Sequence, residues 1–323
     1  MKALVYEGIE TLAVRDVAQP QPRPGEELIR VAAAGICGSD MHAYLGHDSR
    51  RPAPLILGHE AAGVIVGGTR AGERVTINPL VGCRTCGACL AGRDNLCPKR
   101  QIISMPPREG AFAQFVPVPG KNLVTVPDRV PLEKAALAEP LAVGWHAVRL
   151  GLAGLKPDME RMALVIGGGA IGMAVALALK ASGVTDLTIV EPNSGRAAYL
   201  SDMGERVVVE ADRMYPLIFD AVGIAATRAV ASARALPGGA ILHIGLGEDT
   251  GGLDIRRMTL QEIAFTGTYT YSAEEFRETA LAIFDGRLGG LDWTEERALA
   301  DGAGAFADLR AGRVAAPKIV LRP

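Results

Sequence analysis

Four cysteines crowded into fifteen residues carry the clearest chemical signal in the sequence. They follow the spacing C-x2-C-x2-C-x7-C and are Cys83, Cys86, Cys89 and Cys97. Four thiolates on a short loop close a tetrahedral zinc shell with no open position, which is typical of a structural site. An iron–sulfur cluster is the alternative, but the last spacing in the ferredoxin run is three residues instead of seven. A nucleic-acid-binding zinc ribbon is disfavoured, because no aromatic residue lies between the first and last cysteine to stack bases.

A second set of metal-binding side chains is spread over the first half of the chain. Cys37, His59, Glu60 and Glu139 supply one thiolate, one imidazole and two carboxylates. Each one alone has a simpler explanation, such as a small buried cysteine or a solvated carboxylate. Together they match the mixed ligands of a catalytic zinc ion, which keeps one position open for water or substrate.

A glycine-rich loop lies between an apolar run and a helix-like segment. The run 163–166 precedes the motif G-x-G-x-x-G, and the segment 173–182 follows it. The first glycine makes a tight turn, the second lets the backbone approach a pyrophosphate, and the third permits close helix–strand packing. The loop residues expected to contact a dinucleotide are Gly167, Gly169, Ala170, Ile171 and Gly172.

The end of the next apolar run bears on which dinucleotide binds. Glu191 ends the run 187–190, where a carboxylate would accept a hydrogen bond from the ribose 2′-hydroxyl. A carboxylate there repels a 2′-phosphate and favours NAD over NADP. Arg196 keeps NADP open as an alternative, because it could pair with that phosphate or merely cover the adenine.

The elements that position these groups must belong to more than one domain. The chain has 323 residues, about twice the typical domain length of ~150.

Its formal charge of −2 gives no global basic surface for nucleic acid. Residues 162–179 carry no charge, but the glycines in their middle favour strand, turn and helix over a membrane span. The odd count of five cysteines and the lack of an export signal predict a reducing, cytoplasmic location.

These motifs, taken in order, resemble the zinc-dependent medium-chain dehydrogenases, the superfamily of alcohol, sorbitol and threonine dehydrogenases. The resemblance rests on Gly35-Ile-Cys-Gly-Ser-Asp40, Gly58-His-Glu60, the cysteine lobe, Glu139-Pro140, the glycine loop and the ending Pro317-Lys-Ile-Val-Leu321. It implies an α/β protein with a GroES-like β-rich catalytic domain and a Rossmann domain with a doubly wound parallel sheet. We place the catalytic domain at 1–142 and 272–323, with the zinc lobe at about 83–97, and the NAD-binding domain at 143–271. The resemblance further implies two zinc ions per chain, NAD, a small alcohol substrate and a homo-oligomer, either a dimer or a tetramer.

The same resemblance assigns roles to individual residues of the catalytic domain. Cys37, His59 and Glu139 occupy the zinc-ligand positions, and Glu60 either ligates zinc itself or stands behind the ligands. Which of the two glutamates is the third ligand stays open, because in the polyol branch the residue at the Glu139 position can reach zinc through water. Three further residues are expected to orient the histidine or to carry the proton. Asp40 would hydrogen-bond the zinc-bound histidine, and Ser39 would accept the alcohol proton, with His42 as a candidate end of the relay.

The choice of alcohol is less well marked in the sequence. The segment 105–110 is similar to a loop of polyol dehydrogenases, and Tyr44 also favours a polyol. Thr270, however, stands where sorbitol dehydrogenase-like members carry an arginine that contacts a substrate hydroxyl. Arg108 could compensate for that loss. Polyol or sugar-derived alcohols are therefore expected, with threonine or a simple secondary alcohol as the alternative and a zinc- and NAD-binding sensor without turnover as the non-enzymatic one.

One connection of the expected nucleotide-binding domain is unusually short. Only seven residues, 210–216, separate Val209 from Leu217, whereas a parallel crossover normally takes ~10–12 residues or more. We therefore expect one crossover helix to be missing or reduced to a turn.

Overall fold

A computed structural model describes all 323 residues of the chain. They form two compact units. Unit 1 comprises Met1–Pro140, Ser272–Arg313 and Lys318–Pro323, and unit 2 comprises Leu141–Tyr271 and Val314–Pro317. The short segment Val314–Pro317 thus joins unit 2, although the sequence alone suggested one continuous C-terminal segment in the first domain.

Unit 1 is built from β-sheets with short helices. A three-stranded sheet has the order β2-β1-β4, a larger sheet has the order β10-β6-β5-β3-β18-β17 with β9 also paired to β3, and β7 pairs with β8. The strands are β1 (Lys2–Gly8), β2 (Thr11–Asp16), β3 (Glu26–Gly35), β4 (Leu55–Ile56), β5 (Glu60–Val66), β6 (Arg74–Ile77), β7 (Leu80–Val81), β8 (Gln101–Ile102), β9 (Phe115–Pro119), β10 (Leu123–Thr125), β17 (Thr294–Ala298) and β18 (Lys318–Arg322). The helices are α1 (Gly38–Tyr44), α2 (Gly87–Leu90), α3 (Leu132–Ala135), α9 (Ala273–Phe284) and α10 (Gly302–Arg310) with the 3-10 turns Asp94–Leu96, Gly120–Asn122 and Leu299–Asp301.

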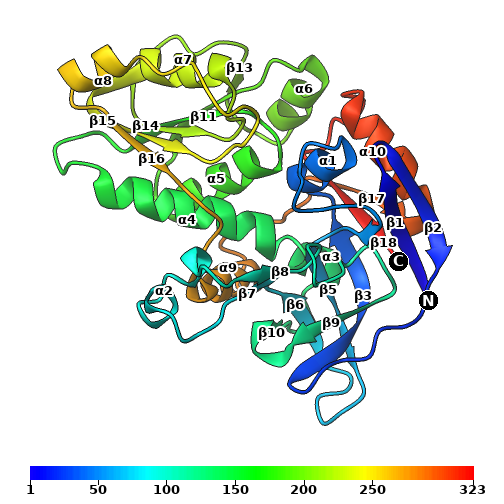
Figure 1. Cartoon of the computed structure of the whole chain (residues 1–323). Helices are drawn as coiled ribbons and strands as arrows, with labels where there is room; N and C mark the ends of the chain where they lie inside the picture. The colour runs from blue at the N-terminus through cyan, green and yellow to red at the C-terminus, as the bar shows by residue number, and fades with distance from the viewer. The chain divides into compact units, whose positions relative to one another are not determined.

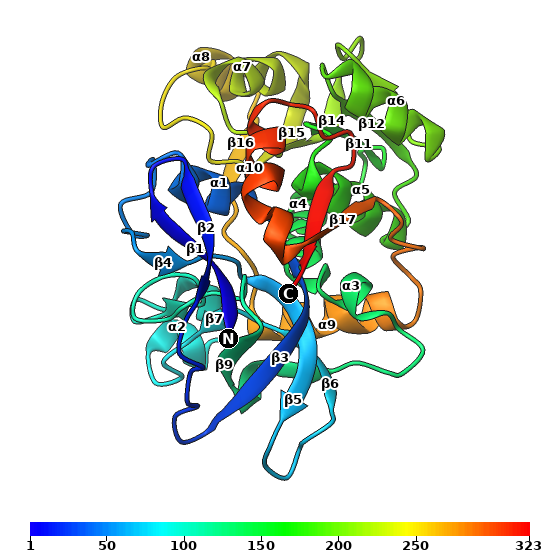
Figure 2. The same ribbon diagram turned by 90° about the vertical axis from the view of Figure 1, so that its right-hand side faces the viewer.

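Strand β3 is the central strand of the larger sheet. It pairs antiparallel with β5 and with β18, which lie beside it in Figure 2. Gly35 at the end of β3 lies opposite Glu60 on β5 and Val320 on β18. Consequently, the end of β3, the start of β5 and the start of β18 meet at one place, and the chain leaves β3 there towards Cys37.

Unit 2 has a six-stranded parallel sheet of order β13-β12-β11-β14-β15-β16. The strands are β11 (Met162–Ile166), β12 (Asp186–Val190), β13 (Val207–Val208), β14 (Tyr215–Asp220), β15 (Ala235–His243) and β16 (Ala264–Gly267). Its helices are α4 (Ala138–Gly154), which begins in unit 1, α5 (Ala170–Ala181), α6 (Ser194–Asp202), α7 (Ala225–Arg234) and α8 (Ile255–Leu260). The strand order reverses between β11 and β14, and ligands of such sheets bind at that switch point.

Helices cover both faces of this sheet, with α4 and α5 on one side and α7 and α8 on the other (Figure 1). A Cβ at Gly151 of α4 would touch Phe219 and Leu242. The alternate residues Ile218 and Ile241 face the opposite side and pack with Met258 of α8. Strands buried on both faces require the continuous apolar runs that the sequence shows.

The crossover from β13 to β14 contains no helix. Strand β14 begins at Tyr215, two residues earlier than the sequence suggested, so only six residues connect the strands. Ala211 of this loop and Tyr215 at the start of β14 are buried in the core of the unit. Arg213 of the loop lies over the Tyr215 ring and pairs with Asp186. Because a helix is missing, a cavity of about 410 Å³ remains between this loop and α7.

The architecture confirms the expected α/β class, with a β-rich unit and a doubly wound parallel sheet. None of the helices combines the length and apolar character needed to cross a bilayer.

Candidate active site and metal centres

Three predicted metal ligands converge in unit 1. One donor atom each from Cys37, His59 and Glu60 lies within 4.8 Å of the others. Cys37 follows β3, His59 immediately precedes β5, and Glu60 begins β5. The convergence therefore follows directly from the pairing of β3 with β5.

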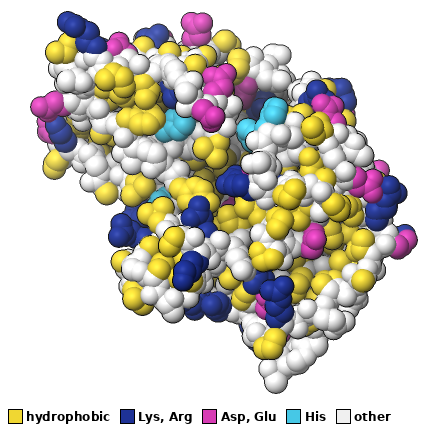
Figure 3. Space-filling model, in the orientation of Figure 1, with side chains coloured by type: hydrophobic (Ala, Val, Ile, Leu, Met, Phe, Trp, Pro, Cys, Tyr) yellow, Lys and Arg dark blue, Asp and Glu magenta, His cyan; other side chains and the backbone are white.

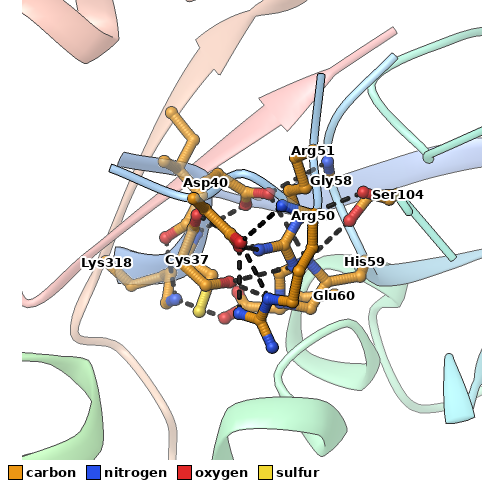
Figure 4. Close-up of polar contacts among 12 residues, drawn as sticks. Cys37, Asp40, Arg50, Arg51, Gly58, His59, Glu60, Ser104 and Lys318 are labelled. Carbon is orange, nitrogen blue, oxygen red and sulfur yellow. Dashed lines mark hydrogen bonds and ion pairs between the residues drawn. The ribbon is translucent and has the colours of Figure 1, made fainter. Parts of the chain in front are cut away.

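Asp40 holds the two ligand-bearing segments together from the first turn of α1 (Figure 4). Its carboxylate accepts hydrogen bonds from the backbone N–H groups of Cys37 at 3.0 Å and Gly58 at 3.2 Å. The same carboxylate lies 3.4 Å from His59 Nδ1. Gly58 has a φ of +92°, and a Cβ there would meet the ring of Phe112, so glycine is required before the histidine.

The electrostatics of the cluster favour a bound cation. Burial lowers the pKa of His59, but the attraction of Asp40 and Cys37 outweighs burial and raises that pKa well above its usual value. Burial raises the pKa of Asp40, but His59 and other partners hold it below its usual value. The anionic groups that raise this pKa give the cluster a negative potential, which a divalent ion would neutralise in place of the proton on the imidazole.

Glu60 has a buried counter-ion that the sequence alone did not indicate. Lys318, at the start of β18, donates hydrogen bonds from Nζ to Glu60 Oε1 at 2.7 Å and to the Ile36 carbonyl at 2.8 Å. Burial lowers the pKa of Lys318, but the attraction of Glu60 and Cys37 raises it overall, which favours the charged ammonium form of the lysine. The other oxygen, Glu60 Oε2, is buried without any hydrogen-bond partner.

The donor set fits a zinc ion of the open, catalytic kind. A thiolate, an imidazole and a carboxylate oxygen without a partner are three protein ligands, which leave a fourth position for substrate. Glu139, on the first turn of α4, is buried and close enough to attract Lys318, but it lies outside the group of converging atoms. This geometry favours Glu60 over Glu139 as the third ligand.

The four cysteines of the lobe also come together, with their Sγ atoms within 4.8 Å of one another. Cys86 caps the N-terminus of α2, and Cys89 lies within this helix. Cys97 follows directly after the 3-10 turn Asp94–Leu96. Hydrogen bonds from Thr85 lower the pKa of Cys83 to about 5, while burial raises that of Cys89 to about 12. Four thiolates at this separation repel one another unless a cation balances them, so the set fits a closed tetrahedral zinc site. Lys and Arg side chains gather on the surface of this lobe (Figure 3).

The glycine-rich loop of unit 2 has the geometry of a phosphate-binding turn. Gly167 has a φ of +99°, and a Cβ at Gly172 would overlap the Gly167 carbonyl oxygen. Gly169 caps α5, and a Cβ there would meet nothing within 4 Å. The helix therefore begins with free backbone N–H groups at Ala170 and Ile171 beside open space, which fits a pyrophosphate.

Glu191 lies against this loop with its side chain buried. Its carboxylate accepts hydrogen bonds from the backbone N–H groups of Gly168 at 3.0 Å and Asn193 at 2.8 Å. Arg196 Nη1 lies 3.6 Å from Glu191 Oε2, and its Nη2 bonds the Val314 carbonyl at 3.3 Å. The arginine is therefore engaged by the acid that is expected to select NAD.

The residues expected to bind the alcohol lie in different surroundings. Arg108 bonds Glu26 and Gln101, each at 2.8 Å, so its guanidinium is engaged within unit 1. The Tyr44 ring packs 5.3 Å from that of Phe306 in an aromatic group. Thr270 has a φ of +48° and a buried hydroxyl with no hydrogen-bond partner. A strained β-branched residue of this kind is typical of functional sites, and the roles of Arg108, Tyr44 and Thr270 towards substrate stay predictions.

Comparison with known proteins places this geometry in a family. The Alcohol dehydrogenase GroES-like domain family matches residues 23–128, and the Zinc-binding dehydrogenase family matches residues 170–285. Sorbitol dehydrogenase of Arabidopsis thaliana is 31% identical over 292 residues, which cover 82% of this chain and 79% of that protein. The chain belongs to the zinc-dependent medium-chain alcohol dehydrogenase superfamily. It is thus an oxidoreductase, as its motifs predicted.

Two further comparisons support this membership of the dehydrogenase superfamily. L-idonate 5-dehydrogenase of Vitis vinifera is 30% identical over 294 residues, which cover 82% of this chain and 78% of that protein. Among solved structures, the RspB alcohol dehydrogenase of Escherichia coli in complex with NADH matches with a TM-score of 0.88 at 25% identity. The match covers 100% of this chain and 99% of the RspB chain.

Three buried cations of the dehydrogenase were not predicted as functional residues. Lys318 pairs with Glu60, Arg51 contacts the residues around His59, and Arg228 bonds several backbone carbonyls of unit 2. In the sequence they are indistinguishable from solvated surface cations. The only available signal for Lys318 was its apolar neighbourhood, Ile319-Val320-Leu321.

Proposed function

We propose that the chain is a zinc-dependent enzyme that transfers hydride between a secondary alcohol and NAD, with a polyol or sugar-derived alcohol as the substrate. The observation that carries this proposal is the convergence of Cys37, His59 and the partner-free Glu60 oxygen in unit 1. A binding protein has no chemical need for an open metal position. When bound, zinc polarises the alcohol oxygen and lowers its pKa, and NAD accepts the hydride.

The chain's own residues hold these groups and move the proton. Cys37, His59 and Glu60 would hold the metal, and Asp40 would fix the orientation of the His59 ring through Nδ1. Ser39, whose Oγ lies 3.4 Å from His59 Nε2, would accept the alcohol proton and pass on its own. Its place on the first turn of α1 gives the hydroxyl a fixed position beside the ligands. His42, three residues further along the same helix, would receive the proton near solvent.

NAD is the proposed dinucleotide. The cradle between Gly167 and Gly172 would hold the pyrophosphate, and Glu191 would accept from the ribose hydroxyls. Because Arg196 is held by Glu191 and by a backbone carbonyl, it has less freedom to pair with a 2′-phosphate. We expect a higher kcat/KM with NAD than with NADP.

The relatives favour a polyhydroxylated substrate, since their names include sorbitol and L-idonate dehydrogenases. The engagement of Arg108 by Glu26 weakens the idea that it replaces the arginine missing at Thr270. Threonine and simple secondary alcohols therefore remain the alternative substrates.

The test is NADH formation by the zinc-loaded protein over alditols, sugar acids, diols and threonine, repeated with NADP and after chelation. Chelator-sensitive oxidation of an alditol or sugar acid supports the proposal. Activity confined to threonine or simple alcohols would change the substrate but keep the mechanism. Binding of both zinc and NADH with no turnover across the panel would favour a sensor.

We also propose a cytoplasmic homo-oligomer. None of the five cysteines forms a disulfide bond, which suits a reducing compartment. Strand β16 lies at the edge of its sheet, and all four of its residues are exposed, including Phe265 at 38%. An exposed edge strand is a template for pairing with a second copy. Sedimentation should therefore show an oligomer that Phe265→Lys weakens, whereas a wild-type monomer would contradict this part.

A further inference from the structure

A buried guanidinium lies beside the candidate catalytic cluster in unit 1. The Arg51 side chain is only 3% exposed. It donates hydrogen bonds from Nε to the Ser104 carbonyl at 3.0 Å and from Nη1 to Asp48 Oδ2 at 2.6 Å. Longer contacts run from Nη1 to the Ser39 carbonyl at 3.4 Å and from Nη2 to Ser39 Oγ at 3.5 Å. Arg51 thus holds two serines from different segments.

Both of these serines contact the histidine of the cluster, and Figure 4 shows Ser104 beside His59. Ser39 Oγ lies 3.4 Å from His59 Nε2, and Ser104 Oγ lies 3.3 Å from His59 Nδ1. The contacts form a closed ring from Arg51 through Ser104, His59 and Ser39 back to Arg51. One guanidinium therefore fixes the groups on both sides of the imidazole.

We propose that Arg51 is a positioning residue of the reaction, which orients the Ser39 hydroxyl and holds the Ser104–His59 contact in place. This inference rests on the proposed function, in which Ser39 accepts the alcohol proton. No local pattern indicates such a role, because Arg50 and Arg51 are adjacent and resemble two solvated surface cations.

The chemistry of the donor explains how the orientation arises. Arginine only donates hydrogen bonds, so Nη2 occupies one lone pair of Ser39 Oγ and turns the serine proton away from Arg51. The hydroxyl is left with one lone pair to accept a proton and one proton to pass on. Lysine carries the same charge on one atom and cannot reach both serines and Asp48 at fixed angles.

The negative charge of Asp48 is shared between Arg51 and the neighbouring Arg50. Asp48 also accepts from Arg50, at 2.8 Å and 3.0 Å, so one carboxylate serves two guanidinium groups. Removing Arg51 therefore leaves Asp48 paired with Arg50 and creates no isolated buried carboxylate. Arg50 is the matched control, because its side chain is 59% exposed and it shares the Asp48 carboxylate with Arg51.

The experiment compares Arg51→Met, Arg51→Lys and Arg50→Met in the zinc-loaded protein, with zinc analysis, thermal unfolding and the kcat and KM of the alcohol oxidation. We expect Arg51→Met to lower kcat by about 100-fold, as a misplacement of about 1 Å does. The KM for NAD and the content of two zinc ions should stay unchanged. Arg51→Lys should unfold at the same temperature as the wild type but have a kcat as low as that of Arg51→Met. Arg50→Met should have the kcat of the wild type.

Other outcomes overturn the inference. Equal kcat values for Arg51→Met and Arg50→Met would show that the serine contacts do not matter. Recovery of wild-type kcat by Arg51→Lys, or loss of zinc together with kcat, would assign Arg51 a structural role only. If Arg51→Met does not fold, the Arg51→Lys result decides between these possibilities. A wild-type protein that oxidises no alcohol would instead contradict the proposed function.

Discussion

Glu60 and Glu139 have the same side chain, but their surroundings make them unequal as candidate zinc ligands. The Glu60 carboxylate is fully buried, with one oxygen bonded to Lys318 and the other without a partner. A buried carboxylate needs a cation, and a single ammonium group serves only one of its two oxygens. The remaining oxygen is therefore the better candidate for a metal.

Replacing Lys318 tests this assignment at the level of one residue. Lys318→Met leaves a buried carboxylate unpaired and should lower the free energy of unfolding by about 3–5 kcal/mol in zinc-free protein. Zinc would supply the missing positive charge if Glu60 ligates it, so the loss should be smaller in zinc-loaded protein. Urea denaturation of both forms measures the difference.

The matched control is Lys2→Met, which removes an ion pair with Asp16 between side chains that are 54% and 77% exposed. Exposed pairs contribute at most about 1 kcal/mol, so this variant should change little in either form. An equal loss for Lys318→Met with and without zinc would argue against Glu60 as a ligand.

Arg108 gives a prediction that depends on pH. Burial raises the pKa of Glu26, but hydrogen bonds from Arg108 and from the Arg23 backbone outweigh burial and lower it. A group with a lowered pKa stabilises the fold above its unfolded pKa of about 4, and that stability is lost as the pH falls through the folded value. Arg108→Gln should therefore lower the free energy of unfolding at neutral pH by about 1–3 kcal/mol. Below about pH 4 the free energies of unfolding of the variant and the wild type should become equal.

Denaturation at several pH values, together with the KM of the alcohol, checks this account of Arg108. A variant with wild-type stability and a raised KM would show instead that the guanidinium serves the substrate.

At this scale the candidate ligands stand out in the sequence, whereas the residues that contact them do not. Cys37, His59 and the four lobe cysteines are recognisable because their residue types and spacing are unusual. Lys318 bonds a residue 258 positions away, and no local pattern encodes so distant a pair. Arg51 was missed for the same reason, since burial depends on the whole fold.

At the scale of elements, two loops at the carboxyl ends of β14 and β15 are held together by Arg228. The guanidinium is 5% exposed and donates to the carbonyls of Gly223 at 3.0 Å, Glu248 at 2.9 Å and Gly251 at 2.7 Å, and also to that of Thr250. These loops lie at the end of the sheet where dinucleotides bind. Arg228 is thus the main support of the segment 248–251.

Arg228→Leu should release this segment, because several carbonyls lose their donor at about 1–3 kcal/mol for each buried group. Amide hydrogen exchange within 245–252 should become faster, while exchange in β11 should stay slow. Arg256→Leu, at an exposed position on α8, is the control and should leave both regions unchanged. Unchanged exchange in the Arg228 variant would show that the loops hold each other without the arginine.

Elements with a strong local pattern were predictable, and connections were predictable in part. The apolar run, glycine loop and helix at 162–181 appear as β11 and α5, since each step has its own local cause. The count of residues between Val209 and Leu217 anticipated a crossover without a helix. It could not reveal that Ala211 and Tyr215 would join the core beside β11 and β15, because that packing depends on the whole sheet.

At the scale of the whole molecule, the order of motifs along the chain anticipated the α/β class better than composition did. Composition and charge excluded only broad classes. The return of the chain to unit 1 at 272–313 and 318–323 brings Lys318 into the same sheet as Glu60. Strand β18 therefore contributes Lys318 to the candidate cluster, whose three proposed ligands lie between residues 37 and 60.

We propose that the chain has two distinct zinc sites and that the site of Cys37, His59 and Glu60 is the catalytic one. The most direct test is metal analysis combined with NADH formation for wild type, Cys37→Ser and Cys97→Ser. We predict two zinc ions in the wild type, and one zinc ion with no turnover in folded Cys37→Ser. Cys97→Ser should lose the lobe zinc and stability but keep zinc at the catalytic cluster. A Cys37→Ser variant that retains both zinc ions and oxidises the alcohol at the wild-type rate would contradict the account.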